Sequence, residues 1–230
     1  MKIVLQKFIA EREFFSRRQA EVLIREGGVK LNGKIAALGD RADDDDVVEV
    51  RGKKVKSLDT NKKNISFVLN KPIGYVCTTR MFKNEQNVFD LIDTRERLFI
   101  VGRLDKDSRG LVLLTNDGAM AQKMTHPKYE CQKTYEVKVT GPEKFDEAQV
   151  DFVERNFING VNIGDEDGVA IAQAVDYLGD GVFKVILTQG KKRQLRRMFG
   201  ALGYSVLDLK RTQMGEFKLG NLPEGQYKKV

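Results

Sequence analysis

The pattern of apolar and polar positions divides the chain into a small N-terminal part and a larger C-terminal part. Apolar residues at helical spacing begin at Leu5, and Ser16–Gln19 has the capping-box form that opens a second helix. Asn32-Gly33 lies between two short alternating segments and predicts a β-hairpin. A further short strand is expected at 47–50. We therefore expect residues 1–50 to form a small α/β unit.

Residues 51–63 are rich in lysine and poor in apolar residues, which predicts a basic linker. Beyond it, residues 64–230 contain both strand-like and helix-like segments, and we expect an α+β fold. Strands are expected at 65–69, 98–101, 111–115, 133–139, 183–187 and 204–209. Short helices are expected at 87–92 and 119–124, and a cationic helix at 191–203.

The junction of a charged run and an aliphatic run lies at the middle of the larger part. Residues 103–109 carry two carboxylates, three cations and a hydroxyl, and Leu111–Leu114 directly after them must be buried. Such a junction fixes charged side chains at the edge of a core, where their positions can be controlled. A polar turn between two buried strands explains the same pattern. Composition does not distinguish Asp105 from Asp107.

Arginines gather at two further places. Arg193, Arg196 and Arg197 lie at the glycine-led start of the cationic helix, where guanidinium groups usually meet phosphate or a fixed carboxylate. Arg17 and Arg18 lie in the first turn of the second helix, where the helix dipole disfavours cations unless an anion neutralises them. This placement favours phosphate binding over a solvated helix end.

Two lysines lie close to strand ends in the larger part. Lys71 falls in a turn before Pro72, where it either contacts a phosphate or is merely exposed. Lys133 begins the alternating segment 133–139, whose buried face carries Tyr135, and it is expected at the mouth of that face.

Composition narrows the possible partners and cofactors. The 230 residues carry a net charge of +7, which makes an anionic partner such as nucleic acid plausible. No apolar run approaches the roughly 18 residues of a membrane span, and no secretory signal is present, so we expect a cytoplasmic protein. One histidine and two distant cysteines predict no metal site, and no phosphate-binding glycine loop is found.

The first 50 residues resemble the S4-type RNA-binding domain. The resemblance rests on Ser16 to Glu21, Gly28 to Gly33 and Asp44 to Val50, in that order. It implies an RNA-binding surface made by the second helix and the hairpin, carrying Arg17, Arg18 and Lys30. Affinity through phosphates would make binding strongly salt-dependent.

The larger part resembles the RNA pseudouridine synthases, in particular the branch with an attached S4-type domain that modifies ribosomal RNA. Three motifs carry the resemblance: Asn70–Gly74, Gly102–Leu111 and Gln189–Met198. Lys133-Thr-Tyr135 is a fourth, less specific match. It implies a catalytic domain over 64–230 with a mostly antiparallel, mixed β-sheet flanked by helices and loops. It also implies isomerisation of a flipped-out uridine without a cofactor or metal. The motifs look most like those of the large-subunit enzymes, and small-subunit ribosomal RNA is the alternative.

The resemblance assigns roles to individual residues. Asp105 corresponds to the essential aspartate, which acts either as a nucleophile or as a base at the ribose. Arg196 is expected to pair with that carboxylate, and Tyr135 to pack on the target base. Arg103 is expected to contact the flipped nucleotide or fill its place. Lys71, Lys133, Arg193 and Arg197 are predicted RNA contacts.

Two other classes of function were compared with this one. A non-catalytic RNA-binding or ribosome-assembly protein on the same fold would not need Asp105, Tyr135 and Arg196 together. A metal-dependent nuclease using Asp105 and Asp107 would need a third carboxylate and fewer adjacent cations. We expect a monomer whose partner is ribosomal RNA or a pre-ribosomal particle, since one binding face suffices for each RNA target.

Overall fold

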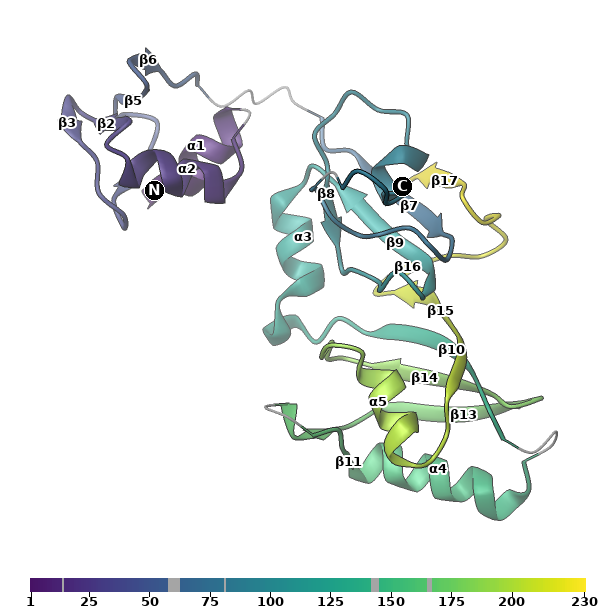
Figure 1. Ribbon diagram of the computed structural model, residues 1–230. Coiled ribbons are helices and arrows are strands. Elements are labelled where there is room, and N and C mark those ends of the chain that lie inside the picture. The colour runs from purple at the N-terminus through teal and green to yellow at the C-terminus, as the bar shows by residue number, and fades with distance from the viewer. Residues whose placement is uncertain (14, 58–62, 81, 142–144, 165–166) are drawn as a thin grey trace. The chain divides into compact units, whose positions relative to one another are not determined.

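The chain folds into two compact units, residues 1–63 and 64–230, and each is described by itself. The computed structural model describes residues 1–13, 15–57, 63–80, 82–141, 145–164 and 167–230 (Figure 1). The N-terminal unit consists of β1 (Ile3–Val4), α1 (Leu5–Arg12), α2 (Arg17–Arg25), β2 (Val29–Leu31), β3 (Lys34–Ile35), β4 (Arg41–Ala42), β5 (Val48–Val50) and β6 (Lys53–Lys54).

The capping box and the hairpin turn that the sequence predicts are both present in the N-terminal unit. The Ser16 side chain accepts from the backbone N–H of Gln19, and the Gln19 side chain accepts from the backbone N–H of Ser16, which completes the capping box of α2. Asn32 and Gly33 both have positive φ, at 50° and 81°, as the tight turn between β2 and β3 requires. Apolar residues of both helices and of the strands form a separate core in this unit.

The basic segment 51–63 departs from the expected linker. β6 pairs with β5, and Val55 is buried in the core of the N-terminal unit, so the ordered unit extends beyond Val50. Pairing with the edge of β5 satisfies the backbone hydrogen bonds of β6, whichever side chains it carries. The lysine-rich composition of this segment therefore gave no sign of the strand. Residues 58–62 of the predicted linker lie outside the described residues.

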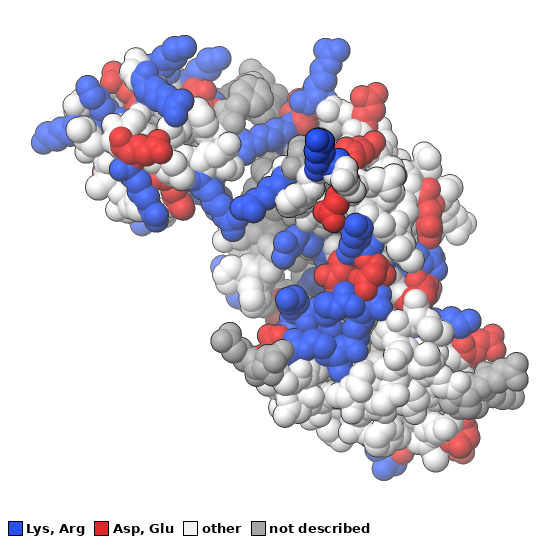
Figure 2. All heavy atoms as spheres, viewed as in Figure 1, with Lys and Arg blue, Asp and Glu red and all other residues white. Residues whose placement is uncertain are grey.

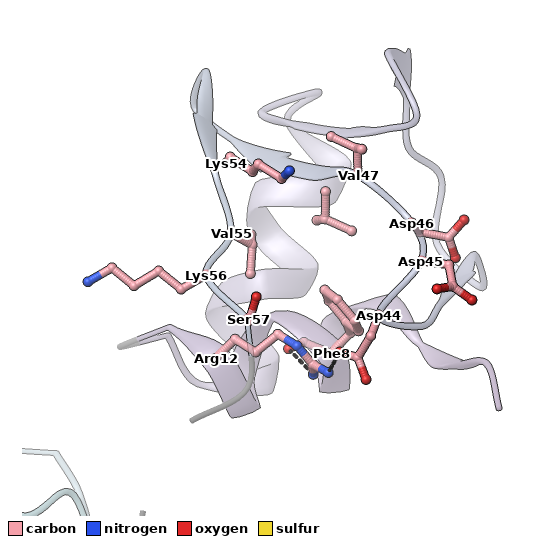
Figure 3. A pocket seen from close by; sticks show the side chains of 11 residues that line it. Phe8, Arg12, Asp44, Asp45, Asp46, Val47, Lys54, Val55, Lys56 and Ser57 are labelled. Atoms are coloured by element: carbon pink, nitrogen blue, oxygen red, sulfur yellow. Dashed lines mark hydrogen bonds and ion pairs between the residues drawn. The ribbon is translucent and has the colours of Figure 1, made fainter. Parts of the chain in front are cut away.

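The acidic turn before β5, residues 43–46, is anchored by hydrogen bonds and ion pairs to neighbouring elements. Arg12 at the end of α1 stacks on the Phe8 ring, 3.7 Å from its centroid, and its guanidinium donates to Asp44 (Figure 3). Asp46 accepts from the Asn32 side chain, and hydrogen bonds from Asn32 and the Asp43 backbone hold the pKa of Asp46 well below its usual range. The aspartates therefore fasten α1 and the hairpin to this turn.

A mixed sheet forms the centre of the second unit, as the sequence predicts. Its strand order is β13-β14-β10-β15-β9-β7-β17, which Figure 1 shows running from β13 near the bottom to β17 near the top. The pairs are antiparallel except β15 with β9, which is parallel. The strands are β7 (Ser66–Lys71), β8 (Phe99–Val101), β9 (Arg109–Thr115), β10 (Lys133–Val139), β11 (Val161–Asn162), β12 (Val169–Ala170), β13 (Ala174–Gly179), β14 (Val182–Leu187), β15 (Val206–Met214), β16 (Phe217–Lys218) and β17 (Tyr227–Lys229).

Both faces of this sheet are covered, which explains the continuous apolar run in β9. Val112 and Leu114 belong to the large core that includes residues of α4 and α5, whereas Leu111 and Leu113 pack in the smaller core with α3. A strand buried on both faces loses the usual alternation of apolar and polar residues. The helices are α3 (Gly118–Thr125), α4 (Glu147–Asn159) and α5 (Gln194–Ala201), with 3-10 turns η1 (Val88–Leu91) and η2 (Pro127–Tyr129).

Two elements differ from their predicted bounds. The cationic helix begins at Gln194 rather than at residue 191, because Arg193 has a left-handed backbone with φ of 50°. β15 continues to Met214, well past the predicted end at 209, because charged residues such as Arg211 are paired with strands on both sides. None of the described helices is long and apolar enough to span a bilayer.

Candidate active site

The loop between β8 and β9 presents Asp105 to solvent from a fixed base. Asp105 has a side chain that is 47% exposed, whereas Leu104 and Ser108 on either side are buried. The Ser108 N–H donates to the Asp105 carbonyl at 3.1 Å, which closes the turn around the two aspartates. A carboxylate is therefore displayed on a short, tightly held loop at the edge of the core.

Gly110, at the end of this loop, allows β9 to approach β15 closely. It has a φ of 103°, and a Cβ added there would lie 2.3 Å from the Arg211 carbonyl oxygen. Glycine is the residue that combines this conformation with such a close backbone approach. Gly110, which follows the polar run in the motif, is therefore required because any side chain would clash with β15.

Asp107 is held by two arginines from the start of α5. Arg193 donates to both of its carboxylate oxygens, at 3.1 and 2.9 Å, and Arg196 Nη2 donates to its backbone carbonyl at 2.8 Å. Burial opposes ionisation of Asp107, but the Arg193 hydrogen bonds and the Arg196 charge outweigh it and lower its pKa. In Figure 2, Lys and Arg atoms gather over the start of α5 beside a group of acidic atoms.

The predicted pairing of Arg196 with Asp105 is wrong in this structure. The ion pair of Arg196 is with Asp107, at 3.4 Å, and its guanidinium also donates to the Val206 carbonyl. Among the described residues, the cation within ion-pair distance of Asp105 is Arg193, whose Nη1 lies 3.9 Å from Oδ2. Both arginines reach the loop: Arg193 contacts both aspartates, whereas Arg196 contacts Asp107.

We expect Asp107→Asn to destabilise the catalytic unit in a pH-dependent way. A lowered folded-state pKa means that ionised Asp107 stabilises the fold above the ordinary value of 3.8, and this contribution is lost as the pH falls through the lowered pKa. The difference in unfolding free energy between wild type and variant should therefore be full at neutral pH and shrink on acidification. Urea unfolding from pH 7 to the acid limit of the fold measures it.

The matched control for that series is Asp151→Asn, which removes a half-exposed carboxylate paired with Arg155 one turn along α4. An exposed pair of this kind contributes little, so the control should differ little from wild type over the same pH range. A wild-type advantage over Asp107→Asn that stays constant down to the acid limit would contradict the role given to the ionised carboxylate.

The predicted RNA contact Lys71 is also corrected. Its side chain is 0% exposed, and its ammonium donates to the carbonyls of Ser108, at 2.6 Å, and Pro72, at 2.9 Å. Burial lowers the pKa of Lys71. Lys71 ends β7 opposite Gly110, so its side chain runs beneath the loop and supports it rather than meeting RNA.

Tyr135 lies on the same row of the sheet as the base of the loop. Gly110 pairs with Arg211, and Arg211 pairs with Tyr135 on the next strand. Two strand spacings separate Gly110 from Tyr135, a distance of about 10 Å. Tyr135 is 8% exposed and belongs to the large core, on the buried face that the alternation of β10 predicts.

Comparison of this chain with known proteins shows the family to which it belongs. Residues 65–201, more than half of the chain, match the family model of the RNA pseudouridylate synthases, and residues 5–48 match the model of the S4 domain. This chain belongs to the RNA pseudouridine synthases. The family resemblance, the enzyme class and the N-terminal S4 domain inferred from the motifs are thereby confirmed.

Similarity to individual pseudouridine synthases extends over nearly the whole chain. It is 37% identical over 234 residues to the ribosomal large subunit pseudouridine synthase B of Bacillus subtilis, covering 98% of this chain and 91% of that protein. It is 34% identical over 226 residues to the dual-specificity RNA pseudouridine synthase RluF of Escherichia coli K12, covering 97% and 74%. A crystal structure of a pseudouridylate synthase superposes with a TM-score of 0.68 at 30% identity, covering 99% of this chain and 96% of the other.

The structure of this synthase separates its predicted RNA contacts by exposure. Arg17 and Arg18 at the start of α2, Lys30 on β2, Arg103 and Arg193 are exposed. Arg17, Arg18, Lys30 and Arg103 are available to a polyanion, whereas the guanidinium of Arg193 is already bound to the Asp107 carboxylate.

Two other predicted contacts of the synthase are engaged within the fold. Lys133 is half-buried and donates to the Cys131 carbonyl at 3.1 Å, and burial lowers its pKa. Arg197 donates to the carbonyls of Ile163 and Gly164 and to the Asp167 carboxylate. Arg197 therefore fastens α5 to the segment after β11, a role that its position in a cationic run did not indicate.

Proposed function

We propose that this synthase converts uridine to pseudouridine in ribosomal RNA, specifically that of the large subunit, with Asp105 as the essential group. The observation that carries the proposal is the half-exposed Asp105 carboxylate on a rigid loop, 3.9 Å from Arg193, inside the segment that matches the family model. Full-length similarity to the large-subunit synthase B of Bacillus subtilis supports the choice of subunit.

The geometry supports a division of roles among three elements. Asp105 attacks the anomeric carbon of the ribose or removes the proton from the neighbouring carbon, and either step detaches uracil from its ribose. Tyr135 packs on the freed base while it turns, and Arg193 aims the carboxylate. Uracil is then rejoined to the anomeric carbon through C5, which gives up its proton, while N1 gains one. Because the product is an isomer of the substrate, the reaction needs no oxidant, no reductant and no cofactor.

The target uridine must leave its stack to reach Asp105, at a cost of a few kcal/mol. Arg103 is exposed two residues before Asp105, where it can contact the flipped nucleotide or take its place. Exposed Arg17, Arg18 and Lys30 on the S4 domain would bind phosphates of the same RNA. We further propose a cytoplasmic monomer that acts on ribosomal RNA or on a pre-ribosomal particle.

Release of tritium from C5-labelled uridine tests the proposed reaction. We expect the purified protein, without added cofactor, to release tritium from large-subunit ribosomal RNA and to leave the RNA chain intact. Mapping of pseudouridine in RNA from a deletion strain then identifies the position that depends on this chain.

Each alternative has its own outcome in these assays. Release from small-subunit RNA alone would transfer the assignment to that subunit. Magnesium-dependent shortening of the RNA would favour a nuclease, and binding without release would favour an assembly protein. Transfer RNA is tested as a further substrate in the same tritium-release assay.

A further inference from the structure

Arg211 on β15 is a buried cation to which the proposed chemistry gives no role. Its side chain is 1% exposed and is the largest of the fully buried side chains. Desolvating a charge is costly, and an apolar side chain of similar volume often stabilises a core as well or better. Stability alone therefore does not explain an arginine at this position.

The guanidinium of Arg211 joins the two ends of the loop that carries Asp105. Its Nε donates to the Leu111 carbonyl at 2.7 Å, and its Nη2 donates to the Gly102 carbonyl. These carbonyls lie three residues before Asp105 and six residues after it. A planar guanidinium donates from separate nitrogens in one rigid plane and so fixes the separation of two acceptors, whereas an ammonium donates from a single atom on a flexible chain.

The backbone of Arg211 connects the same loop to the strand of Tyr135. Arg211 pairs with Gly110 on one side and with Tyr135 on the other. The approach at Gly110 is so close that a Cβ there would lie 2.3 Å from the Arg211 carbonyl oxygen. One residue thus contacts the loop through its side chain and the tyrosine strand through its main chain.

We propose that Arg211 is a positioning residue for pseudouridine formation, which fixes the loop of Asp105 relative to the strand of Tyr135. The proposal rests on the proposed function, because it assumes that Asp105 performs the chemistry. Arg211 itself touches neither the substrate nor the reacting atoms. Its effect is on the placement of the carboxylate, for which an error of about 1 Å can lower the rate about 100-fold.

Arg211→Lys tests this role, because lysine keeps the positive charge but replaces two donor nitrogens at a fixed separation with a single nitrogen. We expect kcat for tritium release to fall about 10- to 100-fold, with KM and RNA affinity within about twofold of wild type. Rates are measured at a temperature where circular dichroism shows the variant fully folded. A folded Arg211→Lys enzyme with kcat within twofold of wild type would overturn the proposal.

Arg109→Lys is the matched control, since it makes the same change in an arginine at the start of β9. Arg109 pairs with Asp208 and Glu224 at a partly exposed position and donates to those carboxylates instead of to the carbonyls at the loop ends. Its kcat should stay within twofold of wild type. An equal fall of kcat in both variants would show a general response to loss of an arginine and would count against the role of Arg211.

A second measurement uses the wild-type protein and does not depend on the folding of any variant. The Ser108 N–H donates to the Asp105 carbonyl, so its hydrogen exchange reports whether the loop is held. We expect protection of this amide comparable to that of the β9 amides. Exchange at the rate of a free loop would contradict the proposal.

The same assays separate failure of the inference from failure of the proposed function. If Asp105→Asn retains turnover, the catalytic assignment fails. If Asp105→Asn is inactive while Arg211→Lys is unaffected, the assignment stands and the positioning role alone fails.

Discussion

Replacement of Asp105 by asparagine is expected to abolish tritium release, with a loss of at least about 1,000-fold in single-turnover rate. The amide has nearly the shape of the carboxylate, but it serves neither as a nucleophile nor as a base at the ribose. Because the Asp105 side chain is 47% exposed on the surface of the loop, the substitution creates no cavity. The measurement is single-turnover tritium release at saturating enzyme.

The stability of the Asp105→Asn variant should be close to that of wild type. The ion pair of Asp105 with Arg193 is long, at 3.9 Å, and exposed, and such pairs contribute at most about 1 kcal/mol. The sequence-based pairing with Arg196 implied a larger cost, which the observed contacts do not support. RNA affinity, measured by filter binding, should persist, since the exposed cations of both units are unchanged.

Asp107→Asn serves as the matched substitution in the same loop, because it changes the same group two residues away. Asp107 accepts two hydrogen bonds from Arg193, so this variant should lose more stability and much less activity than Asp105→Asn. Retained turnover in Asp105→Asn would remove the catalytic assignment. A reversed order of activity between the two variants would transfer it to Asp107.

Gly110→Ala is expected to destabilise the catalytic unit by about 3 to 5 kcal/mol. The new methyl carbon would lie 2.3 Å from the Arg211 carbonyl oxygen and 2.7 Å from its backbone nitrogen, and φ at this residue is 103°. Relief requires the parallel pair of β9 and β15 to open, because both neighbouring atoms belong to the backbone. Urea unfolding gives the stability, and tritium release should fall together with it as the loop of Asp105 shifts.

Gly118→Ala provides the control for this substitution. Gly118 begins α3, and a Cβ added there meets nothing within 4 Å. Alanine favours helix over glycine, so this variant should be unchanged or more stable by up to about 1 kcal/mol. Equal stability of Gly110→Ala and wild type would show that β9 and β15 can separate without cost, and it would weaken the positioning role of Arg211 as well.

Local features of the fold could be predicted because a few neighbouring residues determine them. The capping box at Ser16, the Asn32-Gly33 turn and the alternation that buries Tyr135 all depend on backbone geometry within one element. The motif around Asp105 could be recognised for a related reason. The tight turn and Gly110 fix the number of residues between the aspartate and the strand that follows it.

Contacts between distant segments could not be predicted in the same way. Lys71 and Arg197 are charged residues, and charge favours exposure. Their charged groups nevertheless donate hydrogen bonds to backbone carbonyls of other segments. A sequence shows the charge of a side chain but not the number of unsatisfied carbonyls that the fold will place around it. The same limit hid Arg211, which lies 100 residues from the carbonyl of Leu111 that it binds.

The sequence by itself determined the family, the elements that carry the motifs and the aspartate that the central motif presents. These depend on local spacing and on residue types that only one kind of turn or strand accepts. The tertiary structure alone decided which cations serve the loop of Asp105: Arg193 and Arg196 beside it, Lys71 beneath it and Arg211 across its ends. The physical reason is that burial and register, set by strands far apart in the chain, determine which charge meets which carbonyl or carboxylate.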